Sequence, residues 1–124
     1  MDPLYVTDSA ELPWTAHKTF PGVAARILID PETGRDLEVR VVRVEPGAEI
    51  SLHTHQGSAE TFYILCGEGE LVLGERIQPF RPGVCVHARS GAEHAVRNTG
   101  TAEVQLLAIF APPLTRPAPT SGRQ

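Results

Sequence analysis

Short apolar runs separated by proline- and glycine-rich turns constrain the fold of this chain more than any other feature of its sequence. The runs are rich in β-branched and aromatic residues, as strands are. They cover residues 24–29, 37–45, 50–53, 61–66, 70–73, 84–88 and 104–110. No stretch shows a convincing helix periodicity. The pattern therefore predicts an all-β domain in which sheet packs on sheet to form a barrel.

Four of these runs give sharper expectations. Residues 24–29 and 37–45 flank a turn with proline and glycine, which predicts a hairpin, and the apolar positions change phase at Val41 and Val42, which predicts a bulge there. Alternation places Ile50 and Leu52 on the strand face opposite His53, so we expect both faces of that strand to be occupied. Residues 104–110 are apolar at both alternating sets and predict a strand buried on both faces.

The segment from His53 to Glu60 has the spacing of a metal site. His53 and His55 are two residues apart, so on an extended strand both imidazoles project from one face. Glu60 follows a short polar stretch with a glycine, which can turn the chain so that the next strand presents its carboxylate beside them. Phe62 and Ile64 share the face of Glu60. A carboxylate among apolar neighbours favours a cation-binding role over a solvated one.

Two longer patterns resemble the signatures of the cupin superfamily. The stretch Gly47-x5-His53-x-His55-x4-Glu60-x6-Gly67 resembles the first signature at every fixed position. The stretch Gly83-x5-Arg89-x-Gly91-x2-His94-x3-Asn98 resembles the second, with Arg89 where the family usually has proline. Arginine leaves φ free where proline would fix it, so the departure concerns the turn before His94 and removes no ligand.

The resemblance implies a double-stranded β-helix, or jelly-roll, barrel. It implies metal ligation by His53, His55, Glu60 and His94, and turns at Gly47, Gly67, Gly83 and Gly91. It also suggests a homodimer, to which strands with two apolar faces point as well.

Further polar residues are candidates for roles around the site. His87 and Tyr63 are candidate catalytic proton donors. His87 shares a strand face with Cys85 and serves in the pocket if that face is the interior, or packs at an interface if it is not. A Cys85–His87 nucleophilic pair lacks an identifiable third residue to orient the base. His17, upstream of the barrel, is expected as a surface or lid residue.

The predicted pocket wall is apolar, from Phe62, Ile64 and Cys85. Few polar side chains would orient a substrate, and this composition suits a small, oxygen-bearing, partly apolar molecule. Arg89 is placed at the pocket mouth. Arg97 alternates away from the face of His94 and is expected on the solvated surface.

Three histidines and one carboxylate suit Fe, Mn, Ni, Cu or Zn, and affinity alone does not choose among these divalent metals. The favoured function is a dioxygenase-like oxidoreductase acting on a small chelating substrate, a chemistry that similar single-domain cupins include. One alternative is a non-redox lyase, isomerase or decarboxylase with His87 or Tyr63 as proton donor. Another is a non-enzymatic cupin that binds a small molecule.

Length and composition fit one small domain with a small-molecule partner. The 124 residues are 41% hydrophobic and 21% charged, with net charge −4 and no cluster of Lys or Arg, which argues against nucleic acid. No run approaches the roughly 18 residues of a membrane span, and the N-terminus resembles no signal peptide, so we expect a cytoplasmic protein with Cys66 and Cys85 reduced.

Three segments follow from the same pattern. Residues 1–22 form an N-terminal arm in which Trp14 and Phe20 must be buried against the barrel or a partner chain. Residues 23–111 form the barrel. Residues 112–124 form a proline-rich tail that we expect to be disordered.

Overall fold

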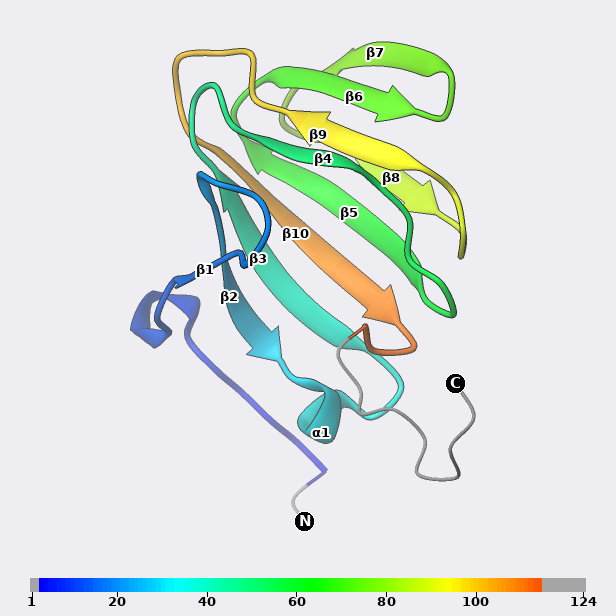
Figure 1. The fold of residues 1–124 in the computed structure, drawn as a ribbon. Helices are drawn as coiled ribbons and strands as arrows, with labels where there is room; N and C mark the ends of the chain where they lie inside the picture. The colour runs from blue at the N-terminus through cyan, green and yellow to red at the C-terminus, as the bar shows by residue number, and fades with distance from the viewer. Residues whose placement is uncertain (1–2, 115–124) are drawn as a thin grey trace.

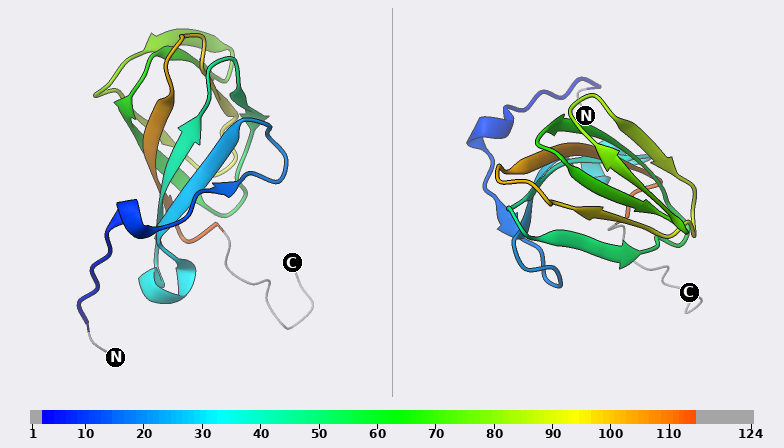
Figure 2. Two further views of the ribbon diagram at one scale, coloured as in Figure 1. Left: turned by 90° about the vertical axis from the view of Figure 1, so that its left-hand side faces the viewer. Right: turned by 90° about the horizontal axis from the view of Figure 1, so that it is seen from above.

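The computed structural model describes residues 3–114 and consists of two antiparallel sheets (Figure 1). The strands are β1 Thr15–Ala16, β2 Val23–Ile29, β3 Glu38–Val44, β4 Glu49–His53, β5 Ala59–Cys66, β6 Gly69–Leu73, β7 Arg76–Phe80, β8 Cys85–Ala88, β9 His94–Arg97 and β10 Val104–Ala111. One sheet has the order β1-β2-β3-β10-β5-β8, and the other has the order β4-β9-β6-β7. The sheets curve around a common interior (Figure 2). The predicted all-β, double-stranded β-helix (jelly-roll) architecture is confirmed.

The hydrophobic core lies between the two sheets. It contains Val23, Val44, Phe62, Ile64, Leu71, Phe80, Val96, Val104, Leu106, Ala108 and Phe110. On β10 every second residue from Val104 to Phe110 is buried, while Leu107 and Ile109 point to the outer face and are only half-buried. The expectation that this strand is buried on both faces therefore holds only for its inner face.

The predicted hairpin is β2 and β3, but the predicted bulge at Val41 and Val42 is wrong. Strand β3 pairs with β10 without interruption, and the irregularity lies on β2, between Ile27 and Ile29. The apolar phase change has another cause. Glu38 and Arg40 occupy the inner positions at the start of β3, where Arg40 Nε donates a hydrogen bond to Glu38 Oε2 at 2.8 Å.

The expectation for Ile50 is also wrong. The pairing of β4 with β9 shifts between Ile50 and His53, which places one extra residue in β4. Ile50 consequently packs against the core on the same side as His53, while Leu52 is 51% exposed. The face of β4 opposite the ligands is thus open.

Two single helical turns complete the described part of the chain. They are η1, Ser9–Glu11, and α1, Pro31–Gly34, which forms the β2–β3 turn with Asp30 accepting a hydrogen bond from Thr33 N–H. Among the described residues, no helix has the length and apolarity to cross a membrane. The expected disorder of the tail concerns residues that mostly lie outside the described range. At the tail's start, Ser58 Oγ donates to the Pro112 carbonyl at 2.6 Å.

The N-terminal arm is fixed to the barrel, as the aromatic residues in it predicted. Strand β1 pairs with β2, and Arg26 Nε donates to the Leu12 carbonyl at 2.9 Å. Trp14 lies against two guanidinium groups, with Arg26 Cζ 4.3 Å and Arg43 Cζ 4.4 Å from the indole centroid. The arm therefore covers the outer face of β2 and β3.

Replacing Trp14 with leucine should lower the free energy of unfolding by about 1–2 kcal/mol, because two cation–π contacts are lost while an apolar side chain remains. Urea denaturation followed by circular dichroism measures this change. Val6 is 92% exposed in the same arm, so Val6→Ala serves as the control and should shift stability by less than about 0.5 kcal/mol. Equal stability of both variants would show that the indole does not anchor the arm.

Candidate metal centre

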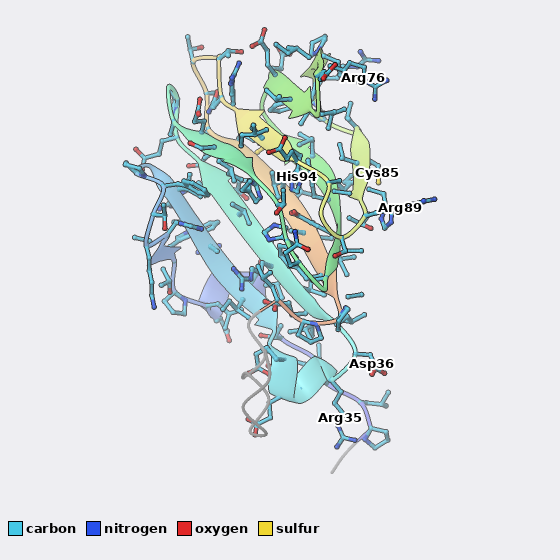
Figure 3. All side chains as sticks on the ribbon, turned by 45° about the vertical axis from the view of Figure 1, so that its right-hand side comes forward. Arg35, Asp36, Arg76, Cys85, Arg89 and His94 are labelled. Carbon is cyan, nitrogen blue, oxygen red and sulfur yellow. The ribbon has the colours of Figure 1, made fainter. Side chains whose placement is uncertain are left out.

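Both sheets contribute to one cluster of metal-binding side chains. His53 ends β4 and lies directly opposite His94, the first residue of β9. Glu60 comes from β5 in the other sheet, and His55 lies in the connection between β4 and β5. Figure 3 shows His94 between the two sheets. The structure thus brings together the four residues that the sequence pattern singled out.

The four side chains are close enough to share one ion. One ligand atom from each residue lies within 4.8 Å of the others. Glu60 Oε1 is 2.9 Å from His94 Nε2 and 3.3 Å from His55 Nε2. The imidazole centroids of His53 and His94 are 4.3 Å apart.

Backbone carbonyls orient two of the rings. His53 Nδ1 lies 2.6 Å from the Ser51 carbonyl, and His94 Nδ1 lies 3.0 Å from the Ala92 carbonyl. A carbonyl oxygen only accepts, so each Nδ1 carries the proton and donates it. This leaves Nε2 of each ring for the cluster, which is the arrangement that histidine ligands to metals usually have.

The electrostatics of the cluster favour a carboxylate among imidazoles. Burial alone would raise the pKa of Glu60, but hydrogen bonds and positive charge from His55 and His94 lower it to about 2. Burial would lower the pKa of His94, but the contact with Glu60 and the Ala92 carbonyl raise it. The pKa of His53 is lowered, first by burial and then by the neighbouring histidines. Glu60 therefore stays ionised, and His94 holds a proton where an ion would bind.

The residues fit a divalent transition metal. Ligand atoms about 2.1 Å from one ion lie at most about 4.2 Å apart, so the observed 4.8 Å spread closes with small side-chain adjustments. Three nitrogen donors and one oxygen donor suit the same metals that the sequence indicated, from iron to zinc. Glu60 is 7% exposed and would otherwise keep a buried negative charge paired only with the histidines His55 and His94.

The turn before β9 supports the cluster without the usual proline. Ala92 N–H donates to the Arg89 carbonyl at 3.0 Å, which closes the turn although Arg89 replaces proline. Gly91, with φ at +85°, donates its N–H to the His55 carbonyl at 2.9 Å. The turn therefore holds the backbone of one ligand directly.

A cavity of about 240 Å³ opens beside the cluster. Apolar side chains make up most of its wall, and the polar groups are Thr54, His17, Arg40 and three of the four ligands, His53, His55 and Glu60. The lining residues are His17, Phe20, Val23, Ala25, Arg40, Val42, Ile50, His53, Thr54, His55, Glu60, Leu106, Phe110 and Leu114. The volume suits a small organic molecule.

The predicted wall of this cavity needs correction. Phe62 and Ile64 share the face of Glu60, as predicted, but they are 1% and 0% exposed and lie in the core instead of the cavity wall. Cys85 lies on the outer face of β8. Sequence reasoning missed Arg40, because a charged residue inside a valine-rich strand has no periodic signal that marks it as inward-facing. Its ion-pairing partner two residues away, Glu38, was the available hint.

His87 and Tyr63 lie away from the cluster. In the pairing of β5 with β8, Thr61 is opposite His87 and Tyr63 is opposite Cys85, so all four share the outer face while Glu60 points inward. His87 Nδ1 lies 2.8 Å from Thr61 Oγ1, and Tyr63 is 46% exposed. The structure does not bring either candidate proton donor to the metal ligands.

The remaining candidate residues lie at the rim of the cavity or on the surface of the protein. His17 is an exposed residue at the cavity rim, where it stacks on Phe20 with ring centroids 4.5 Å apart, so the surface or lid interpretation fits. Partial burial and the charge of Arg40 lower the pKa of His17. Arg97 pairs with Glu49 and Glu70 on the surface. Arg89 is exposed and is not among the residues that line the cavity (Figure 3).

The two cysteines, Cys66 and Cys85, are free, in agreement with the expected reduced thiols.

Comparison with known proteins agrees with the fold and the site. The cupin domain family matches residues 40–110. An oxalate-binding protein from Thermotoga maritima is 34% identical over 56% of this chain and 57% of its own length. Protein SchB from Streptomyces halstedii is 33% identical over 77% of this chain and 71% of its own.

Solved structures extend the match to nearly the whole barrel. The crystal structure of a predicted oxalate decarboxylase from Thermotoga maritima superposes with a TM-score of 0.78 at 26% identity. The match covers 86% of this chain and 98% of that one. With both sheets, both signatures and the four clustered side chains in place, the chain belongs to the cupin family.

Proposed function

We propose that this protein is a metal-dependent, dioxygenase-like oxidoreductase that acts on a small, oxygen-bearing, chelating substrate. The observation that carries the proposal is the position of His53, His55, Glu60 and His94 beside a mainly apolar cavity of about 240 Å³. A divalent ion held by these four side chains would supply Lewis-acid or redox chemistry to a substrate in the cavity.

The chain itself contributes binding, orientation and exclusion of water. The apolar wall from Phe20, Ile50 and Leu106 dries the cavity around the carbon skeleton of a substrate. His87 and Tyr63 lie on the outer face, so neither is within reach of a bound molecule. Among the described lining residues, His17 is the only histidine besides the ligands. This site therefore suits a reaction that needs few side chains to donate or accept protons.

A non-redox lyase, isomerase or decarboxylase is the second candidate, and His17 favours it. His17 Nδ1 accepts hydrogen bonds from Thr19 N–H and Phe20 N–H at 3.0 and 3.2 Å, so its proton is on Nε2. That group is a proton donor at the cavity rim, in place of the two residues that lie outside. The similarity to an oxalate-binding protein and to a predicted oxalate decarboxylase also supports this candidate.

Metal analysis and oxygen uptake distinguish the candidates. The untagged protein is purified without oxygen, its metal is identified by mass spectrometry, and dioxygen consumption is followed with small enols and diols. Bound iron, manganese, nickel or copper with uptake supports the dioxygenase. Zinc without uptake, but with product that disappears in His17→Gln, supports the second candidate. Ligand-induced stabilisation without any product contradicts both and indicates a binding protein.

The protein should form a homodimer through the outer face of the larger sheet. Tyr63 and Leu65 are 46% and 44% exposed there, next to the half-buried Leu107 and Ile109 of β10. Light scattering should give twice the 13.4 kDa of one chain. Tyr63→Lys should produce monomer, because a charge at the centre of an apolar interface is costly. Ile77, 57% exposed on the other sheet, provides the control Ile77→Lys, which should stay dimeric. A monomeric wild type would contradict the expectation.

A further inference from the structure

Arg40 is a cation inside the barrel beside the metal-binding cluster. Its side chain is 15% exposed and lines the cavity from β3. Nε donates to Glu38 Oε2 at 2.8 Å, and Cζ lies 5.4 Å from the centroid of the Phe110 ring. The ion pair with Glu38 explains why a charge is tolerated inside the barrel. It does not explain why Arg40 also lines a cavity.

Strand register places Arg40 at a defined distance from the cluster. Phe110 on β10 lies directly opposite both Glu38 and Glu60, and Ala108 lies opposite both Arg40 and Phe62. Strands β3 and β5 are therefore two strand spacings apart, about 10 Å. Ala108 between them is 0% exposed and belongs to the core, and the residues of β10 that line the cavity are Leu106 and Phe110.

The Phe110 ring links the two ends of the cavity. Its centroid is 5.2 Å from that of His55, and Arg40 lies over the same ring. The remaining wall is apolar, with Phe20 from the N-terminal arm, Leu106 from β10 and Leu114 from the start of the tail. The cavity thus has a cluster of metal ligands at one end, a guanidinium at the other, and apolar side chains between them.

The charges of the lining favour an anion. Three neutral imidazoles and one carboxylate would leave a divalent ion with a net charge of about +1. Arg40 adds a guanidinium to the lining, whereas Glu38, which balances its charge, is 0% exposed and is not among the lining residues. A guanidinium with free fork positions binds carboxylates better than any neutral group.

We propose that this cavity selects small organic anions that carry a carboxylate at one end and a chelating pair of oxygens at the other, joined by an apolar body. The carboxylate pairs with Arg40 and the chelating oxygens face His53, His55, Glu60 and His94. The assignment rests on the metal centre of the proposed function and deepens it by naming the substrate class.

Two ligands that differ only in charge test the assignment. The protein is loaded with zinc, so that no redox reaction competes, and titrated by calorimetry with 3,4-dihydroxybenzoate and with 3,4-dihydroxybenzamide. Both present the same chelating oxygens, but only the first carries a carboxylate. We expect the benzoate to bind at least about tenfold more tightly, because a charge-assisted hydrogen bond replaces a neutral one.

Substitutions on β3 test whether Arg40 causes the preference for the benzoate over the benzamide. Arg40→Gln should reduce the benzoate-to-benzamide ratio to about one, and Arg40→Lys should restore part of it. The double variant Glu38→Gln/Arg40→Gln removes the buried carboxylate as well and should give the same ratio if the single variant folds poorly. Arg43 is the matched control, since it lies on the same strand but on the outer face against Trp14. Arg43→Gln should keep the wild-type ratio.

The outcomes separate this inference from the proposed function. Zinc retention with equal binding of the two ligands, or with no binding of either, overturns the inference and leaves the metal centre intact. A ratio that survives Arg40→Gln, or that falls equally in Arg43→Gln, also overturns it. Failure to retain zinc overturns both proposals.

Discussion

Replacing His94 with alanine should lower the affinity for the divalent ion by at least about 100-fold while the barrel remains folded. Changing a residue that only supports a metal ligand costs 10–100-fold, so loss of a ligand costs more. His94 is 3% exposed, and its Nε2 lies 2.9 Å from Glu60 Oε1, so the substitution removes a buried nitrogen donor from the cluster. Competition against a fluorescent chelator, with metal content by mass spectrometry, measures the loss.

His87→Ala is the matched control for this substitution. His87 is also a strand histidine, but it faces outward and contacts Thr61. The control should keep the wild-type affinity, and circular dichroism should show that both variants keep their sheet content. Unchanged metal affinity in His94→Ala would remove His94 from the ligand set and, with it, the contribution of β9 to the site.

Much of the site could be predicted because its spacing is local. His53 and His55 have the spacing of two that an extended strand places on one face, although β4 ends at His53, and Glu60 lies within reach after one short turn. The fourth ligand, His94, is remote in sequence and came from the resemblance of two motifs to the cupin signatures. The structure then shows why the motifs work together, since the pairing of β4 with β9 sets His53 opposite His94.

The errors have two physical origins, and the first is that alternation assigns a residue to one face only while the strand register is continuous. One extra residue in β4 puts Ile50 and His53 on the same side although they are three residues apart. On β3 the rule that apolar residues face inward failed, because Glu38 and Arg40 satisfy each other's charge and occupy inner positions. Only the tertiary structure shows such pairing.

The strand register also determines on which face of the sheet the candidate proton donors lie. The sequence left the face of His87 open, whereas alternation placed Tyr63 on the face opposite Glu60. The pairing Glu60 with Ala88 and Thr61 with His87 fixes the outer face for both candidates. The cavity wall depended on long-range packing of the arm and the tail, so Phe20 and Leu114 could not be assigned to it from their local sequence.

The contact between Glu60 and His94 should make the stability of the metal-free protein depend on pH in a defined way. The pKa of Glu60 is lowered from 4.5 to about 2, so its ionised form stabilises the fold above about pH 4.5 and this stability is lost as the pH falls towards 2. The pKa of His94 is raised above 6.5, so its protonated form stabilises the fold below that pH and this stability is lost as the pH rises through the raised pKa.

Glu60→Gln isolates this contact from the other titrating groups. The difference in free energy of unfolding between wild type and Glu60→Gln should be largest from about pH 4.5 to 6.5. It should reach about 3 kcal/mol at most, because the Glu60 and His94 shifts express one shared contact. Urea denaturation of the metal-free proteins between pH 2.5 and 9 measures the difference. A difference that does not vary with pH would contradict the lowered pKa of Glu60.

A bound ion should prevent the loss of stability that the metal-free protein shows as the pH rises. The ion replaces the proton that His94 holds, so below the raised pKa of His94 the affinity for the ion should fall about tenfold for each pH unit. Above that raised pKa the proton no longer competes, and the ion keeps Glu60 and His94 together where the metal-free protein loses their contact. The stability difference between metal-loaded and metal-free protein should therefore grow from pH 5 to pH 8. A constant difference over that range would show that the ion does not bind at His94, because no proton would then be displaced.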